Sequence, residues 1–142
     1  MNDARSLQHT RWECKYHIVF IPKNRRQKLY EYLKKEMGKV FHDLAGQKES
    51  CIEEGHLWSD HVHMMVSVPP KYSVSQVVGF IKGKSAIWVA RRYGRKRNFT
   101  GEHFWARGYY VSTVGRDENI VRAYIKNQQE ADRRLDQLSM FR

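Results

Sequence analysis

CIEEGHLWSDHVHMMVSV, residues 51–68, is the stretch that decides the fold of this chain of 142 residues. It holds two strand-like runs, Cys51–Trp58 and His61–Val68, on either side of the short polar turn Ser59-Asp60. This arrangement predicts a β-hairpin. Pro69-Pro70 ends the second strand, because proline has no amide proton to donate to a sheet.

The second of these strands has two different faces, because successive side chains in a strand point to opposite sides. One face carries both histidines, and the other is rich in valine. The faces consist of His61, His63, Met65 and Ser67, and of Val62, Met64, Val66 and Val68. We expect the valine-rich face to pack on helices, which leaves the histidines on the open face of the sheet.

Apolar residues on both sides of the hairpin follow the periods of further strands and helices. The elements predicted in this way are a strand over Trp12–Ile21, a helix over Asn24–Ala45 with Gly46 as its C-cap, a helix capped by Ser73 or Ser75, a strand over Phe104–Val114 and a helix over Asp117–Leu138. The order β-α-β-β-α-β plus a trailing helix matches the split βαβ, ferredoxin-like topology. This is an α+β fold with one antiparallel sheet, two helices on one face, and a second face open to a ligand, a partner or the trailing helix.

The chain carries a large excess of positive charge. Lysine and arginine number 26 against 15 aspartate and glutamate residues, which gives a net charge of +11. With 41% hydrophobic and 13% aromatic residues the chain is globular, and its length fits a single domain over residues 1–142. Such an excess causes self-repulsion unless an acidic partner offsets it, and nucleic acid is the usual partner. A basic domain with no such partner is the alternative.

The cysteines and the N-terminus indicate the compartment. Cys14 and Cys51 lie in predicted strands without CxxC spacing, which favours buried thiols in a reducing cytosol over a disulfide. Met1–Thr10 is polar and lacks the apolar core of a signal peptide. No apolar run approaches the ~20 residues that span a bilayer. We therefore expect a cytoplasmic protein without membrane contact.

His61 and His63 form a candidate metal site. Histidines at i and i+2 on a strand project side by side, as ligands of a divalent cation do. Tyr124 and Gln128 lie one turn apart on an apolar stripe of the last predicted helix. A buried amide needs a partner, and its oxygen beside two imidazoles would suit Mg²⁺ or Mn²⁺. The alternatives are two structural histidines and a glutamine bonded to the backbone or lying at the edge of the stripe.

Tyr124 is the candidate nucleophile, because a metal one turn away can polarise the phosphate that a phenol attacks. The pKa of tyrosine is about 10, so attack at neutral pH needs such help. The alternative is the commonest fate of tyrosine, a core aromatic with a hydrogen-bonded hydroxyl.

Basic residues interleaved with aromatic rings follow the second predicted helix. They are Arg91, Arg92, Arg95, Lys96, Arg97 and Arg107, among Tyr93, Phe99, Phe104 and Trp105. Cations and stacking rings suit single-stranded or hairpin nucleic acid, although a charge run can also be a solvated face. Lys82 and Lys84 could contact DNA phosphates or be ordinary helix lysines. Gly79–Ser85 is not a P-loop, because only three residues separate its first two glycines and it lies within a helix pattern.

Five motifs occur in one order along nearly the whole chain: Trp12–Lys23, Asp60–Met64, Lys82–Ser85, Phe104–Tyr110 and Tyr124–Gln128. They resemble the opening strand, metal strand, second helix, fourth strand and nucleophile helix of the TnpA-like, single-tyrosine HUH transposases of bacterial insertion sequences (the IS-two-hundred type). HUH stands for His, hydrophobic residue, His. One His-Val-His would not be specific, whereas five ordered motifs are.

The resemblance implies that His61, His63 and Gln128 hold the metal and that Tyr124 cuts single-stranded DNA. In that family the tyrosine forms a 5′-phosphotyrosine link and releases a 3′-hydroxyl, which later rejoins strands. The family recognises hairpins near the element's ends and acts as a homodimer, in which the tyrosine helix can be exchanged between subunits. The metal strand then spans about residues 61–68 and the nucleophile helix about residues 117–138.

Three alternatives stand beside a transposase. The first is a related HUH endonuclease that cuts repeated hairpins, or a replication-type nickase, which often has two tyrosines where this helix offers only Tyr124. The second is a non-catalytic nucleic-acid-binding module, in which Tyr124 would be dispensable. The third is a zinc hydrolase, which would need Asp60 or Glu54 as a further ligand.

Overall fold

The computed structural model describes residues 5–7, 10–94, 104–115, 119 and 122–127. Its strands are β1 (Arg5–Leu7), β2 (Thr10–Trp12), β3 (Lys15–Phe20), β4 (Cys51–Leu57), β5 (Val62–Ser67) and β6 (Tyr110–Val114). Its helices are α1 (Gln27–Gln47) and α2 (Val74–Val89), with a 3-10 turn over Asn24–Arg26, a π-helical turn over Ala90–Gly94 and a helical segment over residues 122–127.

The main sheet has the strand order β4-β5-β3-β6, and each neighbouring pair is antiparallel. The predicted hairpin is present as β4 and β5, and β5 also pairs with β3. This order places β3 between the hairpin and the last described strand, β6, as the split βαβ topology requires. The predicted α+β, ferredoxin-like fold is confirmed.

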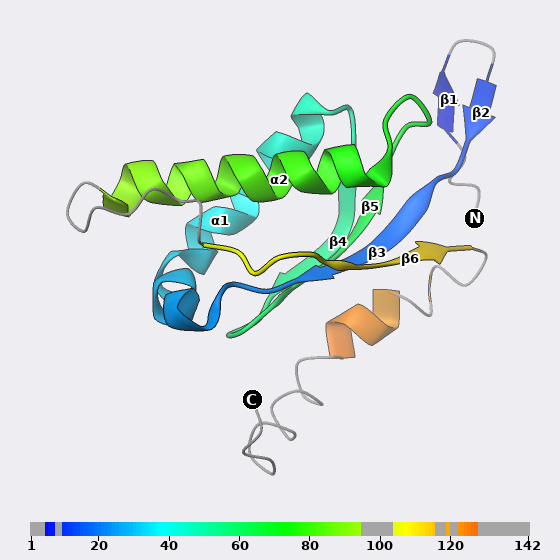
Figure 1. Ribbon diagram of the computed structural model, residues 1–142. Coiled ribbons are helices and arrows are strands. Elements are labelled where there is room, and N and C mark those ends of the chain that lie inside the picture. The colour runs from blue at the N-terminus through cyan, green and yellow to red at the C-terminus, as the bar shows by residue number, and fades with distance from the viewer. Residues whose placement is uncertain (1–4, 8–9, 95–103, 116–118, 120–121, 128–142) are drawn as a thin grey trace.

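The two faces of the sheet are covered differently. Helices α1 and α2 lie on one face, and the helical segment 122–127 lies on the other (Figure 1). The valine-rich face of β5 is buried under α1 and α2, where Val62, Met64 and Val66 join the main core. On the opposite face Ile125 is fully buried in a small second cluster with Met65 and Val114. The predicted assignment of the two faces is confirmed.

The strand predicted over Trp12–Ile21 corresponds to β3 and is shorter than predicted, because Trp12 belongs to another strand, β2. Thr10–Trp12 pairs with Arg5–Leu7 in a separate two-stranded sheet, so β3 begins only at Lys15. Trp12 therefore lies in a strand, but in one that pairs with Arg5–Leu7 and is separate from β3.

The strand predicted over Phe104–Val114 corresponds to β6 and is also shorter than predicted, since it begins at Tyr110 and not at Phe104. Trp105 makes only an isolated bridge to Pro22, and its indole nitrogen donates to Ser85 Oγ at 2.9 Å. Gly108 has a φ of +77°, which turns the chain before it enters β6. The aromatic residues before Tyr110 are thus core anchors and not a strand.

Of the two predicted helix caps, the serine cap of α2 is present and the glycine cap of α1 is not. Ser73 is the N-cap of α2, and it exchanges two hydrogen bonds with Gln76 in a capping box. Gly46, the predicted C-cap, lies inside α1, and the positive φ of 53° falls on Glu49 instead. The prediction for Ser73 is confirmed and that for Gly46 is wrong.

The cysteines are less buried than predicted. Cys51 is exposed and Cys14 is half-buried, because Cys51 opens the edge strand β4 and faces away from the main core. Within the part of the chain that the structure describes, no helix is both long enough and apolar enough to cross a membrane.

We predict that Tyr30→Phe lowers the free energy of unfolding by about 1 kcal/mol. The buried Tyr30 hydroxyl donates to the carbonyl oxygen of His61 at 2.9 Å, and this carbonyl also accepts from the Trp58 amide, so it keeps one partner. Urea titration measures the change. Tyr32→Phe is the control, because Tyr32 is 78% exposed, and an equal loss in both variants would contradict the prediction.

Candidate active site

The start of β5 brings the two histidines of the predicted metal site together. The rings of His61 and His63 lie 4.4 Å apart between centroids, and each residue is only 6% exposed. Val62, between them in sequence, points into the main core, so both imidazoles project from the open face. Two imidazoles are thus adjacent and shielded from solvent.

Asp60 orients the first of these imidazoles. Its Oδ1 lies 2.6 Å from Nδ1 of His61, which places the ring proton on Nδ1 and the ring lone pair on Nε2. A carboxylate in this position sets the tautomer and raises the basicity of metal-ligating histidines in proteins. The sequence placed Asp60 next to the pair but did not reveal this contact, because the side chain could equally have pointed to solvent.

His63 is held in the neutral form that binds metals. Burial, and then the neighbouring His61 and His17, lower the pKa of His63 to about 3. Its Nδ1 is buried and has no hydrogen-bond partner among the described residues. A buried ring nitrogen of this kind fits a ligand that is not a protein group.

His17 is a member of this site that sequence reasoning missed. It lies on the open face of β3, with its ring 5.5 Å from His63, 5.8 Å from Tyr110 and 6.0 Å from Tyr124, all edge-on. Burial lowers the pKa of His17, and its Nε2 has no partner in the described part of the chain. Strand alternation already placed His17 on the face opposite Ile18, which was the available signal.

Tyr124 lies at the edge of the histidine cluster, and it is 53% exposed. The apolar stripe predicted for the last helix placed Tyr124 on the buried side, and this is wrong. The buried residue is its neighbour Ile125, because the helix is turned so that Ile125 packs between Met65 and Val114. This rotation of the helix leaves the phenol ring of Tyr124 beside His17, on the same sheet face as His61 and His63.

Some predicted site residues lie outside the described residues. They are Gln128, the third predicted metal ligand, and Arg95, Lys96 and Arg97 of the basic cluster. Their roles stay predictions. Among the residues that the structure does describe, no group of three or more His, Cys, Asp or Glu side chains is arranged to hold a metal ion.

The remaining predicted DNA contacts differ in their surroundings. The Lys82 ammonium donates to the carbonyl oxygens of Ala106 and Gly108 at 2.9 and 2.7 Å, and burial lowers its pKa. Lys82 therefore holds the segment before β6 in place. Arg92 forms a two-pronged ion pair with Glu36, at 2.6 and 3.2 Å. Lys84, Arg91 and Arg107 are exposed.

A second basic surface, unnoticed in the sequence, lies at the start of α1. A cavity of about 450 Å³ there is lined by Arg25, Arg26, Lys28, Leu29, Tyr32 and Tyr93. We call it the α1 basic pocket. Its residues come from two segments about 60 residues apart in the chain, so only the packing of α1 against the end of α2 reveals it.

We predict that Asp60→Ala weakens Mn²⁺ binding by about 10- to 100-fold, because losing a carboxylate that hydrogen-bonds a metal-ligating histidine has effects of that size. Calorimetric titration of the purified protein measures the affinity. Asp43→Ala, which removes an exposed carboxylate from α1, is the matched control. Equal Mn²⁺ affinities in Asp60→Ala and in the unaltered protein would rule out this role for Asp60.

Comparisons with known proteins agree on one family. A family model described as IS200-like transposase matches residues 10–128. The chain is 44% identical over 141 residues to the transposase for insertion sequence element IS200 of Salmonella typhimurium, covering 99% of this chain and 93% of that protein. The ISDra2 transposase TnpA of Deinococcus radiodurans is 24% identical over 123 residues, covering 85% of this chain and 88% of the relative.

Solved structures share the fold. A crystal structure of a protein from Deinococcus radiodurans R1 has a TM-score of 0.67 and 23% identity, covering 88% of this chain and 98% of that one. A REP-associated tyrosine transposase bound to a REP hairpin has a TM-score of 0.63 and 12% identity, covering 89% of this chain and 74% of that one. At these identities the likeness is one of fold.

Proposed function

This chain belongs to the IS200-like transposase family, and we propose that it transposes DNA by cutting and rejoining single strands through Tyr124. Family membership makes the chain a DNA-processing enzyme of the transposase class. The tyrosine mechanism is the finer proposal, and it is supported by the position of Tyr124 on the sheet face that carries His61 and His63.

The observation that carries the proposal is that one residue, His17, contacts both the proposed nucleophile Tyr124 and the proposed metal ligand His63. His17 lies edge-on to His63 on one side and to Tyr124 on the other. A phosphodiester that contacts the imidazoles of β5 is therefore close to the phenol. The exposure of Tyr124 suits a nucleophile, since a buried phenol such as that of Tyr30 cannot reach DNA.

The proposed reaction exchanges one phosphodiester for another. The phenolic oxygen of Tyr124 attacks the phosphorus, the bond from phosphorus to the 3′-oxygen breaks, and a 5′-phosphotyrosine forms. The proton that the phenol loses is balanced by the proton that the departing 3′-oxygen gains. In rejoining, a 3′-hydroxyl attacks the phosphotyrosine and releases Tyr124, so no outside energy source is consumed.

A divalent cation, Mg²⁺ or Mn²⁺, is part of the proposal. The adjacent imidazoles of His61 and His63 fit such an ion, and Gln128 is the proposed third ligand. When bound, the ion would supply Lewis-acid polarisation of the non-bridging phosphate oxygens. Asp60 would keep His61 in its ligating tautomer, as its hydrogen bond indicates.

The proposed substrate is single-stranded DNA with hairpins at the ends of an insertion sequence. The net charge of +11 supports a polyanionic partner. Arg91, Arg107 and the α1 basic pocket offer exposed cations to it. A structural neighbour is bound to a REP hairpin, which is why we propose a hairpin for this chain.

A homodimer completes the proposal. Strand β6 is an edge of the sheet, and its residues Tyr110 and Val111 are 56% and 37% exposed. An exposed edge with apolar side chains is suited to pairing with a second copy. Exchange of the tyrosine helix between the two copies is proposed from the family resemblance. Sedimentation of the purified protein tests both ideas, because a protein that is only monomeric would contradict the dimer and the exchange.

We predict that the protein forms a covalent adduct with single-stranded DNA from its element's ends, and that Tyr124→Phe abolishes it. The physical reason is that phenylalanine has the same shape but no oxygen to attack phosphorus. A denaturing gel with Mg²⁺ or with chelator measures the adduct. Tyr72→Phe, which removes only an exposed hydroxyl that donates to Glu49, is the control and should keep the adduct.

Three results would contradict the mechanism. An adduct with Tyr124→Phe would assign the nucleophile elsewhere, and an adduct that persists in chelator would exclude metal dependence. Tight DNA binding without any adduct in the unaltered protein would favour a binding module.

We predict that Arg25→Ala combined with Lys28→Ala weakens binding of hairpin DNA and makes the slope of log affinity against log salt less negative by about two. Each phosphate contact releases about one counterion, so two lost cations change the slope by that amount. Fluorescence anisotropy between about 50 and 200 mM salt measures it. Lys34→Ala, whose ammonium pairs with Glu31 on α1, is the control. An unchanged slope in the double variant would remove the α1 basic pocket from the DNA interface.

A further inference from the structure

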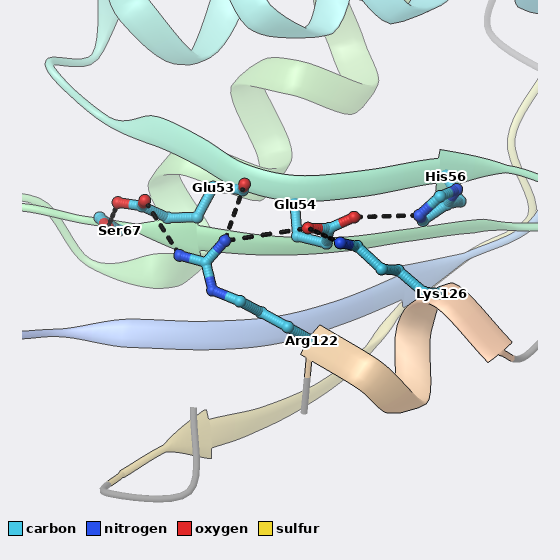
Figure 2. Close-up of polar contacts among 6 residues, drawn as sticks. All are labelled: Glu53, Glu54, His56, Ser67, Arg122 and Lys126. Atoms are coloured by element: carbon cyan, nitrogen blue, oxygen red, sulfur yellow. Dashed lines mark hydrogen bonds and ion pairs between the residues drawn. The ribbon is translucent and has the colours of Figure 1, made fainter. Parts of the chain in front are cut away.

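Strand β4 contains a β-bulge where it meets the helical segment that carries Tyr124. The pairing with β5 shifts between Ile52 and Glu54, so Glu53 is an extra residue with no partner in the ladder. A bulge re-aims side chains that regular alternation would send to opposite faces. Both Glu53 and Glu54 reach the open face of the sheet (Figure 2). We call them the bulge carboxylates.

Arg122 contacts both bulge carboxylates from the helical segment 122–127. Its Nη1 donates to the Glu53 carbonyl oxygen at 3.3 Å and lies 3.8 Å from Oε1 of Glu54, and its Nη2 lies 3.4 Å from Oε1 of Glu53. Lys126, one turn later, brings its ammonium within 4.0 Å of the same Glu54 oxygen. Two cations on one side of the helix therefore face two adjacent carboxylates.

The bulge carboxylates are held in place by the sheet itself. Ser67 of β5 donates its hydroxyl to Oε2 of Glu53, and Nε2 of His56 lies 3.0 Å from Oε2 of Glu54 (Figure 2). Their side chains are only 13% and 15% exposed. Carboxylates with so little access to water depend on fixed partners, and removing a partner has a larger effect than at the surface. They form a preorganised acceptor for Arg122.

Arg122 and Ile125 are the least exposed residues of this segment, and Tyr124 lies between them in sequence. Tyr124 and Lys126 contact the sheet from exposed positions. Ile125 is fully buried with Met65 and Val114. Apolar contact is non-directional, so Ile125 alone would allow the helix to slide or to turn about its axis. A planar guanidinium that meets carboxylate and carbonyl oxygens restricts that freedom, because hydrogen bonds depend on angle.

We propose that Arg122, together with the bulge carboxylates, is a positioning residue that sets the rotation at which Tyr124 faces the histidine cluster of the sheet on which its helix packs. The inference rests on the proposed function, since it takes Tyr124 as the nucleophile. Arg122 itself does not touch the reacting atoms. Its loss should therefore slow the chemical step and leave the binding of DNA and metal in place.

The test compares single-turnover adduct formation at saturating single-stranded DNA and Mn²⁺. Arg122→Ala should slow it about ten- to hundredfold, the range expected when a reacting group is displaced by about 1 Å. Hairpin and Mn²⁺ affinities should stay within about threefold of the unaltered protein. Arg122→Lys should recover part of the rate, because an ammonium can reach the carboxylates but lacks the planar fork. Lys34→Ala, which removes the same charge from an ion pair on α1, should keep the full rate.

Different failures have different meanings. A full adduct rate in Arg122→Ala overturns the inference, and the proposed function stands as long as Tyr124→Phe forms no adduct. A parallel fall of rate, DNA affinity, Mn²⁺ affinity and melting temperature also overturns it, because Arg122 would then serve folding. If Arg122→Ala does not fold, Glu53→Gln removes the carboxylate charge with the same side-chain shape. Under our inference that variant must show the same selective loss of rate, and a full rate overturns it.

Discussion

The structure depends on the burial of β5 on both of its faces. Each residue of Val62–Ser67 is buried, although only one face of the strand is apolar throughout. The valine-rich face is covered by α1 and α2, which is the ordinary packing of a sheet on helices. The other face buries His63 and Ser67, and polar groups out of water must find partners. The polar contacts of the open face follow from this need of buried His63 and Ser67 for partners.

Polar contacts on the open face form two groups on either side of the small cluster around Ile125. One group contains Asp60, His61, His63 and His17, where burial keeps His63 neutral. The other contains the bulge carboxylates with Ser67 and Arg122. Among the described residues, the buried apolar contact here comes from Met65, Val114 and Ile125. Such a small contact gives attraction without direction, which is why the polar groups decide how the helix lies.

Much of the fold could be predicted from local pattern. Alternation in His61–Val68 identified the central strand and assigned its faces, and Ser73 marked the start of α2, because neighbouring side chains and backbone groups determine both. The errors came where a distant contact overrides the local signal. Thr10–Trp12 pairs with Arg5–Leu7 and not with the main sheet. Trp105 and Ala106 are held by hydrogen bonds to Ser85 and Lys82 of α2, so the predicted strand does not begin there.

Sequence by itself determined the residue types at the candidate site and the faces of the strands that carry them, since a period of two is a local property. It placed His61 and His63 side by side, and it placed Tyr124 on a helix near Gln128. Only the tertiary structure decided that Ile125, and not Tyr124, is buried, that His17 contacts both Tyr124 and His63, and that a bulge turns Glu53 and Glu54 toward Arg122. The rotation of a helix and the register of a bulge depend on contacts between segments about 70 residues apart, and no local period encodes them.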